Sequence, residues 1–242
     1  MSFSYRIGFR VAALLYRRAF PVYRVLYGLY KAISERHDRT MASSYLREGC
    51  VVVDVGANIG EFARFAARRV GPDGRVIAFE PSPENYLHLK ATTARMRQIE
   101  PVHAALSDHV GTITLYLSDA MNVDHRTYDA GEDRAEEKVT CFSLDGWLDE
   151  GPVDFIKIDV QGFEYEVVSG MRRILAKNPD VTVAFEFWPA GLRRAGREPS
   201  CLLDLFADLG FGVRFSDGRS WVDTRPNLGD GLLDYVTAVA RR

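Results

Sequence analysis

The hydrophobic pattern beyond residue 50 alternates between short apolar runs and longer segments with one apolar face. The β-branched run 51–55 is typical of a strand buried on both faces, whereas the apolar spacing in 61–70 predicts an amphipathic helix. We expect strands at 51–55, 75–80, 102–107, 154–160 and 181–187, with helices at 61–70, 82–96, 162–178 and 199–210. Repeated strand–helix units predict an α/β fold with a doubly wound, mostly parallel sheet.

Two parts of the chain interrupt this alternation. The segment 111–118 alternates with period two, which predicts an antiparallel, half-exposed strand. The segment 119–138 is polar with little periodicity, so we expect a long loop, and long loops often carry function. No helix separates the last two expected strands, 211–216 and 234–240, which favours an antiparallel hairpin at one edge of the sheet.

The first 31 residues are basic and aromatic, without any acidic side chain. Their basic residues are Arg6, Arg10, Arg17, Arg18, Arg24 and Lys31. No apolar run reaches the roughly 18 residues of a membrane span, and no cleavage site follows the short run 11–16. We predict a helical extension over 1–48, which packs on the domain as a lid, contacts an anionic membrane surface, or does both. The domain itself is expected to span 49–242.

Composition and charge narrow the class of protein. Hydrophobic residues make up 47% of the chain and charged residues 26%, which argues against disorder. The formal net charge of −2 provides no general attraction to nucleic acid. Cys50, Cys141 and Cys201 form neither a close-spaced pair nor a disulfide framework, which favours a reducing, cytoplasmic location.

The loop 54–60 follows the first strand and indicates a nucleotide site. It has no Gly-Lys-Ser/Thr ending, and Gly56 and Gly60 are spaced too widely for a dinucleotide fingerprint. Asp54 would repel a phosphate, which favours a cationic ligand. Glu80 ends the second strand, where a carboxylate accepts hydrogen bonds from both ribose hydroxyls. S-adenosylmethionine carries a sulfonium, an amino group and a ribose but no phosphate, so it fits this site best.

Ligands of open α/β sheets bind beyond the carboxyl ends of the strands. The further residues that we expect to contact the cofactor therefore follow those ends: Ala57, Asn58, Pro81, Ser107, Asp108 and Asp159.

Four sequence motifs, which follow one another along the chain, indicate a particular protein family. The chain contains "VVVDVGANIGEF", "VIAFEPSPENYLHL", "HAALSD" and "DFIKIDVQGFEYEVVSGM". Over roughly residues 50–190 it resembles the FkbM-type family of S-adenosylmethionine-dependent methyltransferases. The resemblance implies a seven-stranded, Rossmann-like methyltransferase sheet and methyl transfer to oxygen, commonly to a sugar or polyketide hydroxyl.

An alcohol becomes a good nucleophile only when it loses its proton, so a base is expected near the transferred methyl group. Asp159 is the first candidate, either as the base itself or as a ligand of a divalent ion such as Mg²⁺. Glu186 ends the neighbouring strand and could join Asp159 in either role, although a metal site would need a third ligand. His125, in the polar loop, is the other candidate base.

The expected acceptor is a small molecule or a lipid-linked sugar such as a glycolipid. With a lipid-linked acceptor, the basic extension would place the enzyme at the inner membrane surface. Two alternatives remain: a non-catalytic nucleotide-binding scaffold and an NAD(P)-dependent oxidoreductase. The intact set of site residues argues against the first, and the missing glycine triplet argues against the second.

Overall fold

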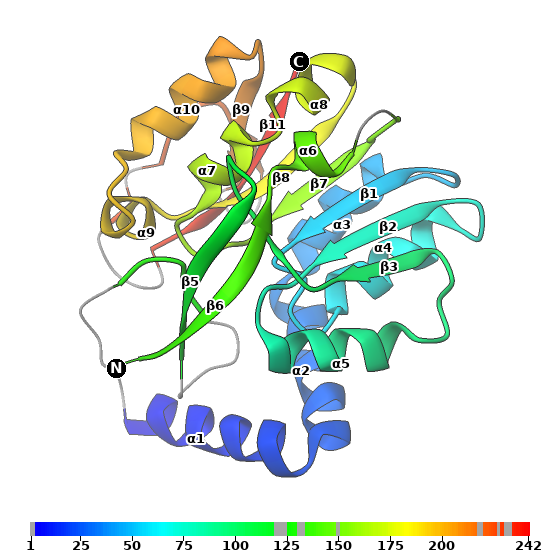
Figure 1. The fold of residues 1–242 in the computed structure, drawn as a ribbon, viewed down its shortest axis with the longest axis vertical. Coiled ribbons are helices and arrows are strands. Elements are labelled where there is room, and N and C mark those ends of the chain that lie inside the picture. The colour runs from blue at the N-terminus through cyan, green and yellow to red at the C-terminus, as the bar shows by residue number, and fades with distance from the viewer. Residues whose placement is uncertain are drawn as a thin grey trace.

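The computed structural model describes residues 3–118, 125–129, 134–148, 151–216, 220–226, 228–229 and 234–242, with only the backbone for 3–10. Its main sheet has eight strands in the order β10-β9-β11-β8-β7-β1-β2-β3 (Figure 1). These strands are β1 (Val51–Val55), β2 (Arg75–Phe79), β3 (Ile99–Val102), β7 (Phe155–Ile158), β8 (Thr182–Phe187), β9 (Gly212–Ser216), β10 (Trp221–Val222) and β11 (Val236–Arg241).

The five strands from β3 to β8 run parallel, which confirms the predicted α/β class with a mostly parallel sheet. β11 runs antiparallel to both β8 and β9 and lies between them. The predicted hairpin pairing is therefore present, but β11 is an inner strand, and the two-residue β10 forms the edge. With β10 the sheet has eight strands rather than the seven that the resemblance implies.

The strand predicted at 102–107 is wrong in its boundaries. β3 ends at Val102, and β4 (Ala105–Leu106) belongs to a second sheet, where it pairs with β6 (Ala135–Phe142). β5 (Gly111–Leu117) completes this sheet and confirms the strand expected at 111–118.

The loop expected over 119–138 is wrong at its end, because residues 135–138 belong to β6 and pair with β5. Their charged side chains hide the strand signal, since this end of β6 is mostly exposed. Arg126 pairs with Tyr116 of β5 through two backbone hydrogen bonds. Residues 119–124 and 130–133 of the expected loop lie outside the described residues.

Most predicted helices are present. α4 (Glu61–Val70), α5 (Pro83–Thr93) and α10 (Pro199–Asp208) lie where the pattern places them, and Ser82 caps α5. The helix expected over 162–178 is instead divided into α7 (Glu164–Ser169) and α8 (Arg172–Lys177). Gly170 separates them at a close approach, because a Cβ atom there would lie 1.9 Å from the carbonyl oxygen of Ser107. Two further short helices are α6 (Leu144–Trp147) and α9 (Pro189–Arg194).

Helices cover both faces of the main sheet. Val53 and Val55 of β1 pack in the cluster that includes α7, α8 and α10. Val52 faces the opposite cluster, formed with α4, α5 and α3 (Arg36–Tyr45). Burial on both faces explains why β1 is a continuous apolar run rather than an alternating one.

Two helices, α1 (Phe3–Arg18) and α2 (Phe20–Ser34), precede α3 at the lower end of the molecule in Figure 1, where α1 lies across the bottom and α2 rises from its end toward the sheet. We call this helix–turn–helix pair the hairpin. Tyr16 and Tyr23 on their inner faces pack against Ile59 of the glycine loop. Phe20 stacks on His88 of α5 with ring centroids 3.4 Å apart. No described helix is both long and apolar enough to cross a membrane. The division of the chain at residue 48 stays a prediction.

Candidate active site

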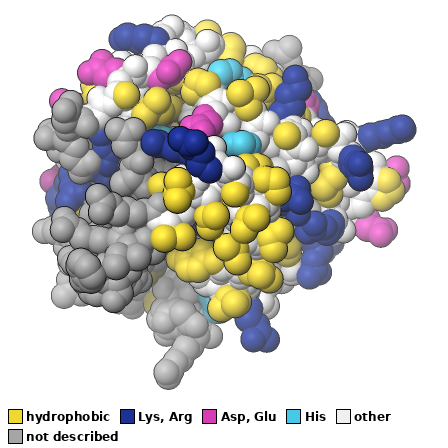
Figure 2. All heavy atoms as spheres, turned by 90° about the horizontal axis from the view of Figure 1, so that it is seen from below, with side chains coloured by type: hydrophobic (Ala, Val, Ile, Leu, Met, Phe, Trp, Pro, Cys, Tyr) yellow, Lys and Arg dark blue, Asp and Glu magenta, His cyan; other side chains and the backbone are white. Residues whose placement is uncertain are grey.

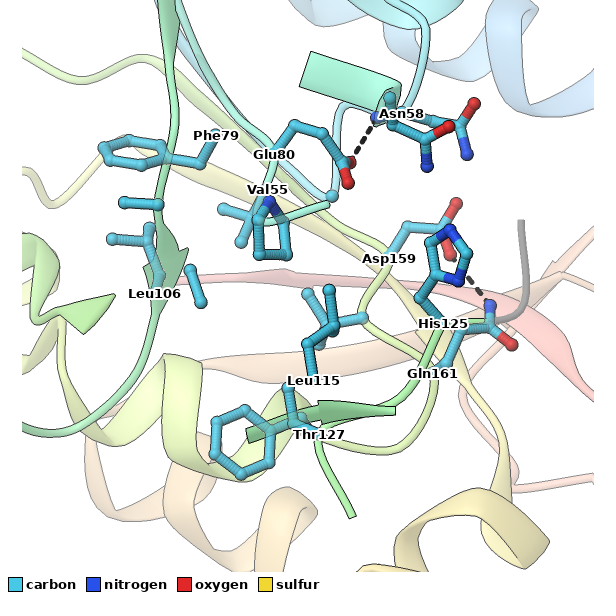
Figure 3. Close-up of a pocket in the computed structure, with 17 residues that line it drawn as sticks. Val55, Asn58, Phe79, Glu80, Leu106, Leu115, His125, Thr127, Asp159 and Gln161 are labelled. Carbon is cyan, nitrogen blue, oxygen red and sulfur yellow. Dashed lines mark hydrogen bonds between the residues drawn. The ribbon is translucent and has the colours of Figure 1, made fainter. Parts of the chain in front are cut away.

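A pocket opens at the carboxyl ends of β1, β2 and β7, where the glycine loop was expected to bind its ligand. It contains about 690 Å³ of empty space, part of which is open to solvent. Glu80 and Asp159 line it from different strands, and residues of β4 and β5 close its other side (Figure 3).

The glycine loop joins the ends of three strands. The backbone N–H groups of Gly56 and Ala57 both donate to the carbonyl oxygen of Phe79 at the end of β2. Gly56 has a φ of +80°, and a Cβ atom there would lie only 2.0 Å from the carbonyl oxygen of Asp159. Only glycine fits this position. Gly60 instead caps α4 and packs against Leu89 of α5, away from the pocket lining.

Glu80 is held by the loops on either side of it. Its Oε2 accepts the backbone N–H of Asn58 at 2.7 Å, and its Oε1 accepts the N–H of Ser82 at 2.9 Å. Burial raises the pKa of Glu80 to about 7, although these hydrogen bonds oppose the shift. A carboxylate has about four acceptor sites, and the Asn85 side chain occupies a third one, so Glu80 retains a site that can accept a ribose hydroxyl.

The opposite end of the pocket carries a polar cluster. Nζ of Lys157 lies 3.2 Å from Oδ2 of Asp159. The side-chain amide of Gln161 donates to Oδ1 of Asp159 at 3.1 Å and to Oε2 of Glu186 at 3.0 Å. The predicted pair Asp159 and Glu186 therefore does lie together, with Gln161 as the bridge.

The two carboxyl groups of this cluster differ in pKa. Burial acts to raise the pKa of Asp159, but the ammonium groups of Lys157 and Lys31 outweigh it and hold this pKa below its ordinary value. Burial, together with the charge of Asp159, raises the pKa of Glu186 well above its ordinary value. Asp159 is therefore the more acidic of the two carboxyl groups, and Glu186 holds its proton to higher pH.

Asp54 lies beneath the glycine loop and does not line the pocket. Its side chain is fully buried, with Oδ1 at 3.6 Å from Nζ of Lys157, and burial raises its pKa. Neither carboxylate oxygen has a hydrogen-bond partner among the described residues. The structure thus places Asp54 beside the cofactor loop, and its direct contact with a cationic ligand stays a prediction.

His125 lines the pocket, but the orientation of its ring favours a hydrogen-bond donor over the predicted base. Its Nδ1 accepts the backbone N–H of Ser118 at 3.0 Å. In the neutral imidazole the proton must then be on Nε2, so this ring donates a hydrogen bond rather than taking up a proton. Asp159 is the better placed base.

Sequence reasoning misjudged the third wall of the pocket. Pro81 lines it as expected, but Ser107 and Asp108 do not. Ser107 is buried and donates to Asp108, whose carboxylate contacts His109 at the surface. The wall consists of Ala104, Ala105 and Leu106, because β3 ends earlier than predicted.

Two further polar residues of the site were not among the predicted ones. Asn85 lines the pocket from the first turn of α5, and Gln161 bridges the two carboxyl groups. Gln161 directly follows a strand, which is the signal that could have identified it. Asn85 had no such signal, because it lies within a helix.

The polar cluster does not fit a divalent cation. Lys157 lies beside Asp159, and the Gln161 amide donates to both carboxyl groups where a metal would need further oxygen ligands. In the described part of the chain, no group of three or more His, Cys, Asp or Glu side chains is arranged to hold a metal ion. The third ligand that the predicted Mg²⁺ site requires is thus missing from these residues.

The same pocket does fit S-adenosylmethionine. Its described lining includes two carboxyl residues, Glu80 and Asp159, and no Lys or Arg, which disfavours a phosphate-bearing nucleotide. Glu80 suits the ribose, whereas Phe79 and Leu106 provide apolar surface for the adenine. The Asp159 end suits the positively charged methionine part.

Comparison with known proteins agrees with this assignment. A family model described as "Methyltransferase FkbM domain" matches residues 54–211. The chain is 26% identical over 204 residues to "Methyltransferase sdnD" of Sordaria araneosa, covering 68% of this chain and 76% of that protein. It is 31% identical over 133 residues to "Hexuronic acid methyltransferase AglP" of Haloferax volcanii, covering 53% of this chain and 52% of that one.

A third relative is "2-O-methyltransferase NoeI" of Sinorhizobium fredii, with 25% identity over 146 residues, 52% of this chain and 59% of the relative. Among solved structures, the precorrin-6y C5,15-methyltransferase of Geobacter metallireducens superposes with a TM-score of 0.50 at 15% identity, covering 84% of this chain and 88% of that one. The family match spans more than half of the chain and includes the glycine loop, Glu80 and Asp159. The protein therefore belongs to the FkbM family of S-adenosylmethionine-dependent methyltransferases.

Proposed function

We propose that the protein methylates a hydroxyl oxygen on a sugar or a similar polyhydroxylated ring. The observation that carries the proposal is the bridge that the Gln161 amide makes between Asp159, which lines the pocket, and Glu186 behind it. Asp159, the more acidic of the two groups, offers carboxylate oxygens to the hydroxyl of a polar substrate. The names of two relatives, a hexuronic acid methyltransferase and a 2-O-methyltransferase, support the same class of substrate.

When bound, S-adenosylmethionine supplies an electrophilic methyl group on a sulfonium. Glu80 and Asn58 would hold its ribose side, and the backbone at Gly56 leaves room for close approach of the ligand. These contacts fix the position of the cofactor relative to Asp159, which lines the same pocket.

Asp159 acts on the acceptor hydroxyl. It accepts the O–H hydrogen bond, orients the oxygen, and takes the proton as the new O–C bond forms and the proton becomes acidic. The Lys157 ammonium at 3.2 Å keeps Asp159 ionised. Its low pKa makes Asp159 a weak base, so proton transfer is expected late in the reaction, when the oxygen already carries positive charge.

Gln161 and Glu186 position this base. Gln161 donates to Oδ1 of Asp159, while Lys157 contacts Oδ2, so both carboxylate oxygens are oriented. Glu186, which shares the Gln161 amide with Asp159, would contact a second oxygen of the acceptor. Recognition of two oxygens favours vicinal hydroxyls over an isolated one.

The test is transfer from cofactor carrying a CD3 group to a panel of free uronic acids, neutral hexoses and matched amines. Mass spectrometry and NMR then locate the label. The proposal expects an O–CD3 ether on a sugar ring, lost in Asp159→Asn. Label on nitrogen or carbon, or cofactor binding without transfer to any hydroxyl compound, would overturn it.

A further inference from the structure

Helix α2 has two chemically different faces. Its inner face carries Tyr23, which is buried, together with Tyr27 and Lys31, which are partly buried. Lys31 lies close enough to Asp159 to lower the pKa of that group. The outer face carries Val22, Val25, Leu26, Leu29 and Ile33, which recur at helical spacing and are all exposed.

This outer face is part of a larger apolar surface, which we call the hairpin surface. Among described side chains, eight of the eleven exposed large hydrophobic residues lie on α1 and α2: Val11, Leu14, Val22, Val25, Leu26, Leu29, Tyr30 and Ile33. Ile33 is 78% exposed and Leu14 is 60% exposed. Figure 2 shows hydrophobic side chains gathered on this side of the molecule, with Lys and Arg around them. A contiguous apolar patch of this kind marks a protein or membrane interaction site.

The charges beside the hairpin surface indicate which of these it contacts. Arg17 and Arg18 are exposed at the end of α1, and Arg24 is partly exposed on α2. The sequence of α1 and α2 contains no Asp or Glu. A basic, apolar helix face is complementary to anionic lipid, with arginines at the headgroups and aliphatic side chains below them.

We propose that the hairpin surface docks on an anionic lipid bilayer. A second copy of the chain fits less well, because a twofold contact would bring these same arginines against one another. The inner face of the hairpin is already occupied, since Tyr16 and Tyr23 pack against Ile59. Docking through the outer face therefore requires no unfolding of the hairpin.

Docking has a consequence for the reaction, which rests on the proposed function. Because Tyr23 on the inner face of α2 packs against Ile59 of the glycine loop and an α-helix is about 10 Å across, this loop would lie roughly one helix diameter from the membrane surface. A sugar held on a lipid headgroup could then reach Asp159.

The test is flotation of the full chain with vesicles of phosphatidylcholine plus phosphatidylglycerol, and with phosphatidylcholine alone. We expect binding to the anionic vesicles that weakens with salt, and little binding to the neutral ones. Leu26→Glu/Leu29→Glu should reduce binding by at least about tenfold. Arg17→Gln/Arg18→Gln should weaken it by about fivefold per residue and reduce its salt dependence.

The control is Val110→Glu, which replaces another exposed aliphatic side chain by one glutamate at a residue 65% exposed beside α6, away from the hairpin. It should bind like the natural sequence.

Thermal unfolding of each variant separates lost binding from misfolding, and the arginine variant remains informative if the leucine variant does not fold. Absence of binding to anionic vesicles, or equal binding by all variants, would overturn the proposal. So would a dimer in sedimentation velocity that Leu26→Glu/Leu29→Glu dissociates. Flotation requires no methyl transfer, so its failure is distinct from failure of the proposed function.

Discussion

Oη of Tyr16 donates a hydrogen bond of 2.8 Å to Oδ1 of Asn85, 69 residues further along the chain and buried with it. Asn85 also lines the cofactor pocket and hydrogen-bonds to Glu80 through its side chain. The N-terminal helix α1 is thus connected through one side chain to the residue that suits the ribose. The N-terminal helices therefore help to hold a residue of the pocket in place.

Replacing Tyr16 by phenylalanine should weaken cofactor binding without abolishing it. The substitution keeps the ring but leaves the buried Oδ1 of Asn85 without its donor, which costs about 1–3 kcal/mol. We expect an unfolding free energy lower by that amount and S-adenosylmethionine affinity reduced by about fivefold or more. Denaturant titration and calorimetry measure the two effects. Tyr30→Phe is the control, because Tyr30 is 63% exposed; equal losses in both variants would contradict the role of the hydrogen bond.

Gly56→Ala should eliminate cofactor binding through a steric clash. The new Cβ atom would lie 2.0 Å from the carbonyl oxygen of Asp159, so β1 and β7 would have to separate at the pocket. Gly49→Ala is a matched control, since Gly49 has a φ of +81° but nothing within 4 Å of the Cβ position. In Gly49→Ala, we expect backbone strain to lower the free energy of unfolding by about 1–2 kcal/mol, while cofactor affinity is retained. Similar affinity loss in both variants would show that φ alone, rather than contact with Asp159, determines the glycine.

Stability of the cofactor-free protein should fall as the pH rises toward neutrality. Burial raises the pKa of Glu80 from 4.5 to about 7 in the folded state. Between these values the folded chain holds a proton that the unfolded chain has released, so stability is full below the lower pKa and is lost as the pH rises through the upper one. The slope is ~1.4 kcal/mol per pH unit for each such group.

Glu80→Gln should make the slope of the unfolding free energy against pH shallower by the contribution of one proton. Denaturant unfolding from about pH 5 to about pH 8 measures this slope. Glu164→Gln provides the comparison, because burial also raises the pKa of Glu164 to about 7. An unchanged slope in Glu80→Gln would show that Glu80 is ionised in the folded protein. Added S-adenosylmethionine should flatten the slope in the natural sequence if the ribose hydroxyls bind the ionised form.

The order of elements was predictable because the relevant information is local. The valine run of β1, the apolar spacing of α4 and the Ser82–Pro83 start of α5 each report their own segment. The break between α7 and α8 was not predictable, since it depends on the carbonyl of Ser107, far earlier in the chain. β4 and the start of β6 were missed for a related reason: a short or charged strand is stabilised by its partners rather than by its own sequence.

The site shows the same division between local and long-range information. Glu80 and Asp159 were identified because each ends a parallel strand, and such ends gather at one edge of a sheet. The raised pKa of Glu186 could not be anticipated, because it depends on burial and on the charge of Asp159. The contribution of Lys31 likewise requires α2 to lie over the sheet, and nothing in its local sequence indicates that position.

Asp159 and Glu186 should respond differently to amide substitution. Asp159→Asn removes the anion that receives the hydroxyl proton, so kcat/KM should fall by about 10²–10⁴-fold. Glu186→Gln leaves that anion in place and keeps an oxygen that can still accept from Gln161, so we expect a change below about fivefold, or ~1 kcal/mol. Steady-state release of S-adenosylhomocysteine measures both rates, and calorimetry checks that each variant still binds S-adenosylmethionine. If Glu186→Gln is as impaired as Asp159→Asn, the roles of the two carboxyl groups are reversed, and Glu186 receives the proton of the acceptor hydroxyl.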